Sequence, residues 1–209
     1  MKNAFYYSLP LALLFCGCNN NPPDSAKMAK EANNAKIDSQ RKNEQPVDSV
    51  TQVFSKADAG FLVGAADGGM MEVQLGQLAQ TKSANRQVKD FGALMVRNHG
   101  EGGEKLKALA VSKNITLPDS ISAGQQKEKE KLQKKKGDDF DRAYISMMVS
   151  DHKKDIREFE KVANNATNSD IKAFARNNLP MLYMHLDSAK SIQKRMGIKE
   201  MPDMSPPYK

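Results

Sequence analysis

From residue 54 onward, apolar side chains recur every three or four positions, which is the spacing of one face of an α-helix. No segment alternates apolar and polar residues in the way that a half-buried strand does. The pattern predicts four helices, running from about Phe54 to Gln80, from Ser83 to Ser112, from Ser120 or Ser122 to Ala163, and onward from a turn at Asn164–Ser169. Gly137 is a candidate interruption of the third helix. Long helices joined by short turns favour an all-α fold, an antiparallel up-down-up-down four-helix bundle.

The start of the chain has the pattern of a secretory signal peptide, with Lys2 followed by a short apolar run from Leu9 to Phe15. This run is too short to span a bilayer, which needs roughly 20 apolar residues. The segment Phe15-Cys16-Gly17-Cys18 resembles a lipobox, in which Cys18 becomes the lipid-carrying N-terminus. Lipidation at Cys16, an ordinary signal peptide and an uncleaved anchor are the alternatives. We therefore expect a lipid-anchored protein of the cell envelope. Asn19, Asn20 and Asn21, with no aspartate, favour the outer membrane, facing the periplasm.

Residues 18–53 are rich in Asn, Ser, Asp, Lys, Gln and Pro and have almost no large apolar side chains, so we expect a flexible tether. The predicted order is a signal peptide at 1–17, lipidated Cys18 and the tether at 18–53, a helical domain at 54–197 and a disordered tail at 198–209. Both cysteines of the chain, Cys16 and Cys18, precede the helical domain. That domain must therefore be held together by its apolar core and not by disulfides.

The net charge of +7 has its densest source in the run KEKEKLQKKK at Lys127–Lys136. One interpretation is a solvated helix face, and the other is attraction to anionic lipid head groups or peptidoglycan. We expect no nucleic-acid partner for an exported protein. The predicted partners are the membrane, through the lipid anchor, and an envelope protein or peptidoglycan.

The three histidines of the chain each lie on the apolar stripe of a different predicted helix, and Glu72 holds the same kind of position on the remaining helix. The candidate metal ligands are Glu72, His99, His152 and His185. Imidazole suits zinc, copper or iron, and a carboxylate adds an anionic ligand. Asp151 and Asp155 flank His152 and are candidates for a further ligand or for orienting its ring. Counted from the turns, Glu72 and His99 differ in height by roughly 7 Å at 1.5 Å per residue, so a single compact site is a hypothesis.

Two alternatives remain at this point. The histidines could be core residues, each hydrogen-bonded to a neighbour, in a structural or interaction module. The twelve methionines, four of which surround His152 and His185 in the sequence, fit copper binding or plain core packing. A hydrolase or oxidase ranks last, because the chain has no GxSxG motif, no glycine-rich phosphate loop before a helix and no cysteine in the helical domain. The chain is more easily interpreted as a non-enzyme.

Several separated motifs resemble the bacterial domain-of-unknown-function family 4142 over about residues 54–195. They are Glu72-Val73-Gln74-Leu75-Gly76-Gln77-Leu78-Ala79, Val88-Lys89-Asp90-Phe91 with Asn98-His99, Leu117-Pro118, Phe140-Asp141-Arg142-Ala143-Tyr144 with Asp151-His152, and Leu179-Pro180 with His185-Leu186. The resemblance implies a ferritin-like helical bundle that is exported, often to the outer membrane, with no assigned activity. Its recurrent polar positions correspond here to Glu72, His99, His152 and His185.

The chain departs from the di-iron ferritin pattern, which requires two Glu-x-x-His motifs. Val96, Val149 and Leu182 stand three residues before the histidines, so ferroxidase or iron-storage chemistry is not expected. The segment FDRAYISMMVSDH also resembles a second helical family, which is associated with copper handling. The sequence thus predicts an envelope lipoprotein whose bundle binds a metal ion, in envelope stress or metal homeostasis.

Overall fold

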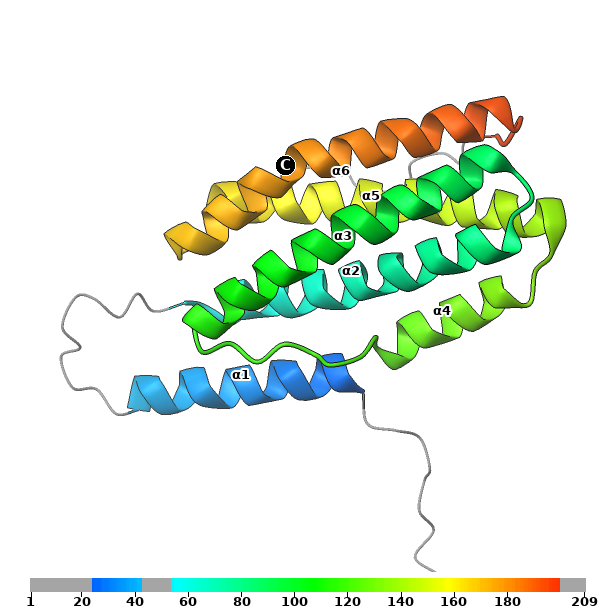
Figure 1. Cartoon of the computed structure of the whole chain (residues 1–209). Helices are drawn as coiled ribbons and strands as arrows, with labels where there is room; N and C mark the ends of the chain where they lie inside the picture. Colours follow the sequence, from blue (N-terminus) through cyan, green and yellow to red (C-terminus); the bar gives the residue numbers. More distant parts are fainter. Residues whose placement is uncertain (1–23, 43–53, 200–209) are drawn as a thin grey trace, which may run out of the picture.

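The computed structural model describes residues 24–42 and 54–199, and these residues form helices and no strand. The six helices are α1 (Ser25–Lys42), α2 (Lys56–Lys82), α3 (Arg86–Ser112), α4 (Ala123–Gln133), α5 (Gly137–Asn165) and α6 (Ser169–Arg195). Figure 1 shows α2, α3, α5 and α6 side by side, with the shorter α1 and α4 along one side of them. The all-helical prediction is confirmed. The described residues form six helices and not the expected four, because α1 was not predicted and the third predicted helix is divided into α4 and α5.

Side-chain caps fix where the long helices begin. The Ser55 hydroxyl accepts from the backbone N–H of Asp58 at 3.0 Å, and the Asp58 carboxylate accepts from the N–H of Ser55 at 3.1 Å, which completes a capping box. Asn85 caps α3 by accepting from the N–H of Gln87. Ser83, where the second predicted helix begins, instead ends α2, so α3 begins three residues later than expected, at Arg86.

The tether prediction is wrong for residues 25–42, which form α1. Ala26, Ala29, Asn33 and Ile37 recur every three or four positions and are buried. The Asn33 amide donates to the carbonyl of Thr116 and accepts from its N–H, both at 2.8 Å. Small alanines and one paired asparagine therefore give this polar segment a contact face without large apolar side chains. The predicted signal peptide, Cys18 and the remaining tether residues lie outside the described part of the chain.

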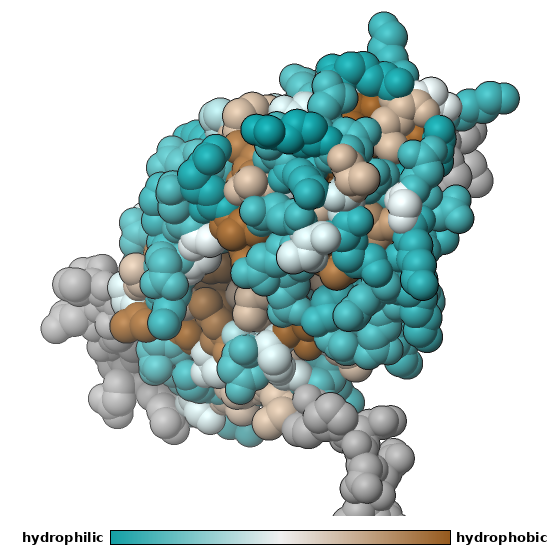
Figure 2. All heavy atoms as spheres, turned by 45° about the vertical axis from the view of Figure 1, so that its right-hand side comes forward, coloured by the Kyte–Doolittle hydropathy of each residue, from teal (hydrophilic) through white to brown (hydrophobic). Residues whose placement is uncertain are grey.

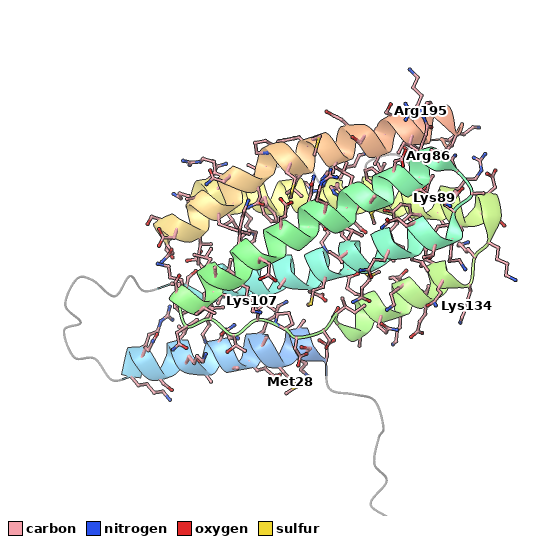
Figure 3. All side chains as sticks on the ribbon, in the orientation of Figure 1. Met28, Arg86, Lys89, Lys107, Lys134 and Arg195 are labelled. Carbon is pink, nitrogen blue, oxygen red and sulfur yellow. The ribbon has the colours of Figure 1, made fainter. Side chains whose placement is uncertain are left out.

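The third predicted helix is divided into α4 and α5 at residues 134–136. This agrees with the prediction that Gly137 is a candidate interruption of that helix. Gly137 has φ of +50°, which a residue without a Cβ adopts at little cost. In α4, Leu132 is buried while Lys127, Lys131 and Lys134 are exposed, as expected of a solvated helix face. Figure 3 shows Arg86, Lys89, Arg195 and Lys134 towards the same end of the molecule.

None of the described helices is long and apolar enough to cross a membrane. The α6 helix continues through Pro180, and α3 continues through Gly100, Gly102 and Gly103. The face in Figure 2 is mostly hydrophilic, and apolar surface appears in gaps between the polar side chains. The predicted tail begins after α6 ends, and residues 200–209 lie outside the described part.

Two large apolar clusters fill the interior of the described part of the chain, and a small third one joins α1 to α2 at Ala26, Ala29 and Val63. Of the two large clusters, the larger is built around Leu75, Met95 and Tyr144, and the smaller around Leu62, Leu106 and Ile171. Along α3, His99 lies between the two sets of positions, and along α2 Glu72 lies next to Met71, at the edge of the larger cluster. A layer of buried polar side chains therefore interrupts the apolar core partway along the long helices.

The α2 and α3 helices come into close backbone contact at two glycines. A Cβ built on Gly76 would lie 2.5 Å from the carbonyl oxygen of Gly92, and one on Gly92 would lie 2.7 Å from that of Gly76. Both distances are shorter than van der Waals contact. The atoms that a Cβ would meet belong to the backbone, which cannot move aside as a flexible side chain can. Glycine at these positions thus sets the spacing of the α2–α3 hairpin, which carries Glu72 and His99.

We expect Gly76→Ala to lower the free energy of unfolding by about 1–3 kcal/mol, because the new methyl group overpacks this contact. Gly64→Ala is the matched control on the same helix, where a Cβ meets nothing within 4 Å. It should raise stability by about 0.5–1 kcal/mol, because alanine loses less backbone entropy in a helix. Urea unfolding measures both. Equal effects of the two substitutions would contradict this account of the hairpin.

Candidate metal centre

The three histidines meet in the interior. His185 Nδ1 lies 3.2 Å from His99 Nε2 and 3.2 Å from His152 Nε2. His152 and His185 are fully buried, and His99 is 8 % exposed. One ligand atom from each imidazole lies within 4.8 Å of the others. The three rings come from α3, α5 and α6, and α2 contributes Glu72 beside them.

Outer partners fix the hydrogen position on two of the rings. His152 Nδ1 lies 2.9 Å from the carbonyl oxygen of Met148, which can only accept, so Nδ1 carries the hydrogen. His99 Nδ1 lies 2.8 Å from Glu72 Oε2, and the carboxylate likewise accepts. In their neutral forms both rings therefore point a bare Nε2 lone pair at the meeting point.

His185 cannot satisfy both lone pairs. Its Nε2 lies 2.9 Å from the Asn98 amide, which pairs with either tautomer depending on which way the amide is turned. If Nδ1 carries a hydrogen, that hydrogen lies between two acceptors and is shared. If it does not, three lone pairs face one another. In both cases the cluster has more acceptors than donors.

Glu72 adds a further acceptor. Its Oε1 is buried, has no hydrogen-bond partner, and lies 3.5 Å from His152 Nε2. Burial raises the pKa of Glu72, but the adjacent His99 and His152 outweigh this and hold the pKa below its ordinary value. The side chain is therefore a carboxylate near neutral pH.

Protonation is disfavoured on the two fully buried rings. Burial, together with the neighbouring His99 and His152, lowers the pKa of His185 to about 3. Burial also lowers the pKa of His152, although Glu72 opposes the shift. At neutral pH, protonation of these rings therefore does not relieve the surplus of acceptors. A metal cation can accept all of these lone pairs.

Two of the three nitrogen spacings fit a transition metal, and all three lie within 4.8 Å. Nitrogens bound at about 2.0–2.1 Å in tetrahedral directions lie roughly 3.3 Å apart. Both His185 contacts, at 3.2 Å, are close to that separation. Glu72 Oε2 orients His99, as a carboxylate commonly does for a metal-ligating imidazole, while Oε1 is directed toward the ligand set.

All four sequence-predicted ligands are brought together, and the two predicted aspartates are not bound to them. No hydrogen bond within the described residues joins Asp151 or Asp155 to an imidazole. Burial and the charge of Glu72 raise the pKa of Asp151 to about 6 and raise that of Asp155 well above its ordinary value. The carbonyl of Met148 takes the orienting role expected of an aspartate at His152.

Asn98 was not among the predicted site residues. Its signal was its place in the Asn98-His99 pair, since consecutive helix residues point about 100° apart and can face different neighbours. His99 turns towards Glu72 and Asn98 towards His185.

A large cavity reaches the site from one side. Its volume is about 1330 Å³, and Glu72 and His99 line it, whereas His152 and His185 do not. It continues along α2 past Gly68 and Gly64 to Phe61. The ligand set therefore meets the cavity at Glu72 and His99, while the rings of His152 and His185 stay fully buried.

Comparisons with known proteins agree on the type of fold. A family model described as "Domain of unknown function (DUF4142)" matches residues 43–192. A crystal structure of a DUF305 fragment from Deinococcus radiodurans is similar with a TM-score of 0.60 at 11 % identity, covering 68 % of this chain and 98 % of that chain. A DUF305 protein from Streptomyces coelicolor, described as a "putative secreted protein", is similar with a TM-score of 0.59 at 13 % identity, covering 69 % and 96 %. A comparison with curated proteins gives no match.

Proposed function

The chain belongs to the family described as a domain of unknown function, DUF4142, and we propose that this member is an envelope lipoprotein that binds a transition-metal ion between its helices. His99, His152 and His185 hold the ion, and Glu72 orients His99 and contributes its second oxygen. The surplus of buried acceptors carries this proposal. Two imidazoles and a carboxylate oxygen present lone pairs to one place without enough hydrogens to satisfy them.

Zinc, copper and iron all suit an imidazole and carboxylate set. Three neutral imidazoles and one carboxylate leave a divalent ion with a net positive charge. The ion would thus offset both the lone-pair repulsion and the burial of the Glu72 charge. A role in metal homeostasis or envelope stress follows from such a centre in an exported protein.

Metal content tests the proposal. We expect near-stoichiometric metal in the full-length protein, purified without chelators and measured by mass spectrometry, and its loss in the His152→Ala/His185→Ala variant. Tyr144→Phe is the matched control, because the Tyr144 hydroxyl is buried without a partner and its removal leaves all three imidazoles. This variant should keep the metal.

Thermal unfolding provides a second readout that does not depend on the variants folding. A metal that binds the folded wild type at 100 times its Kd stabilises it by about 2.7 kcal/mol. Wild-type protein that is metal-free, and whose melting temperature is unmoved by zinc, copper or iron, would contradict the metal proposal. The histidines would then be hydrogen-bonded core residues of an interaction module.

Lipid attachment is the second part of the proposal, and it is supported by the lipobox pattern ending at Cys18. We expect the wild type to incorporate labelled palmitate and to fractionate with membranes. Cys18→Ser should abolish both properties, because it removes the acylated thiol, and the control Cys16→Ser should retain them. Loss of label in Cys16→Ser alone, or an unlabelled wild type, would overturn the assignment.

A further inference from the structure

The cavity beside Glu72 has a shape that the metal site alone does not require. It is lined along α2 by Gly60, Gly64 and Gly68, which are spaced four residues apart. A Cβ built on any of these three glycines would meet nothing within 4 Å. The glycine face therefore borders open space and is not packed against another helix, in contrast to the Gly76–Gly92 contact.

Aromatic rings cluster in the far part of the cavity, among polar residues that include Asp58 and Lys161. Phe61, Phe159 and Phe174 line it, with the ring centre of Phe61 4.9 Å from that of Phe159 and 6.5 Å from that of Phe174. Val111 also lines the cavity and is 74 % exposed. A cluster of aromatic rings that lines a cavity is typical of a site that binds an apolar ligand.

The near end is polar. Glu72 is 4 % exposed, its Oε1 is unpartnered, and both it and His99 line the cavity. Glu72 and Phe61 are 11 residues apart on one helix, which corresponds to roughly 16 Å. The cavity thus joins a polar end at the ligand set to an aromatic end about 16 Å away.

We propose that this cavity binds an unbranched fatty carboxylate, with its carboxylate on the metal beside Glu72 and its chain along the glycine face towards Phe61. The inference rests on the proposed metal site. A divalent ion held by three neutral imidazoles and one carboxylate retains positive charge, which complements an anionic oxygen donor. An extended chain can follow the glycine face over the roughly 16 Å that separate Glu72 from Phe61.

Cobalt-loaded full-length protein tests this proposal with acetate and decanoate as probes, which share a carboxylate and differ in chain length. The visible spectrum of bound cobalt reports binding at the metal, and cobalt content is measured separately. Each buried methylene is worth roughly fourfold in affinity. We therefore expect decanoate to bind at least about a hundredfold more tightly than acetate.

Gly64→Leu places a side chain in the middle of the cavity, away from the ligand set. It should leave cobalt content and acetate affinity unchanged and reduce decanoate affinity to near that of acetate. Gly124→Leu adds the same side chain on α4 outside the cavity and should behave as the wild type. Equal affinities for the two probes in cobalt-loaded wild type, or no effect of Gly64→Leu, would overturn the ligand while leaving the metal site standing. Failure to bind cobalt at all would overturn the metal site, and the ligand proposal with it.

Discussion

The buried carboxylate of Glu72 is the constraint on which the interior of this protein depends. Taking a carboxylate out of water costs several kcal/mol unless charges or donors compensate for it. Only one of its oxygens has a hydrogen-bond partner, His99 Nδ1. That bond turns His99 so that its bare Nε2 points at His185, and the unpartnered Oε1 faces His152. One carboxylate therefore sets the hydrogen position on His99 and leaves an acceptor surplus that a cation resolves.

The surrounding fold brings these groups to one height. The four residues come from two helical hairpins, α2–α3 and α5–α6. In each hairpin the residue on the second helix lies about three residues farther from the turn than the residue on the first. His99 lies beyond Glu72 in this way, and His185 lies beyond His152. Helical side chains lean towards the N-terminus of their own helix. In an antiparallel helix pair, this lean moves the side chain on the first helix away from the turn. It moves the side chain on the second helix towards the turn. The lean offsets about 4.5 Å of backbone rise in each hairpin. The close Gly76–Gly92 contact holds the first hairpin in this register.

Sequence periodicity predicted the long helices and all four polar residues of the site, because a period of three to four identifies the inward face. It overstated the height difference between Glu72 and His99, because α3 begins at Arg86 and not at Ser83, and because counting backbone residues ignores the direction of the side chain. The prediction also missed α1, whose contact face is made of small alanines and the amide of Asn33 and so lacks a strong apolar signal. The roles of Asn98 and the Met148 carbonyl depend on ring orientation, which follows from packing and not from spacing. The ferritin-like topology and the lipid anchor stay predictions.

The central claim is that three imidazoles from three helices bind one ion. X-ray absorption spectroscopy on the zinc-loaded full-length protein measures this most directly. The account predicts a first shell with three imidazole nitrogens at about 2.0–2.1 Å, reduced by one in His185→Ala. A shell of oxygens or methionine sulfurs alone, or a spectrum unchanged by His185→Ala, would contradict it.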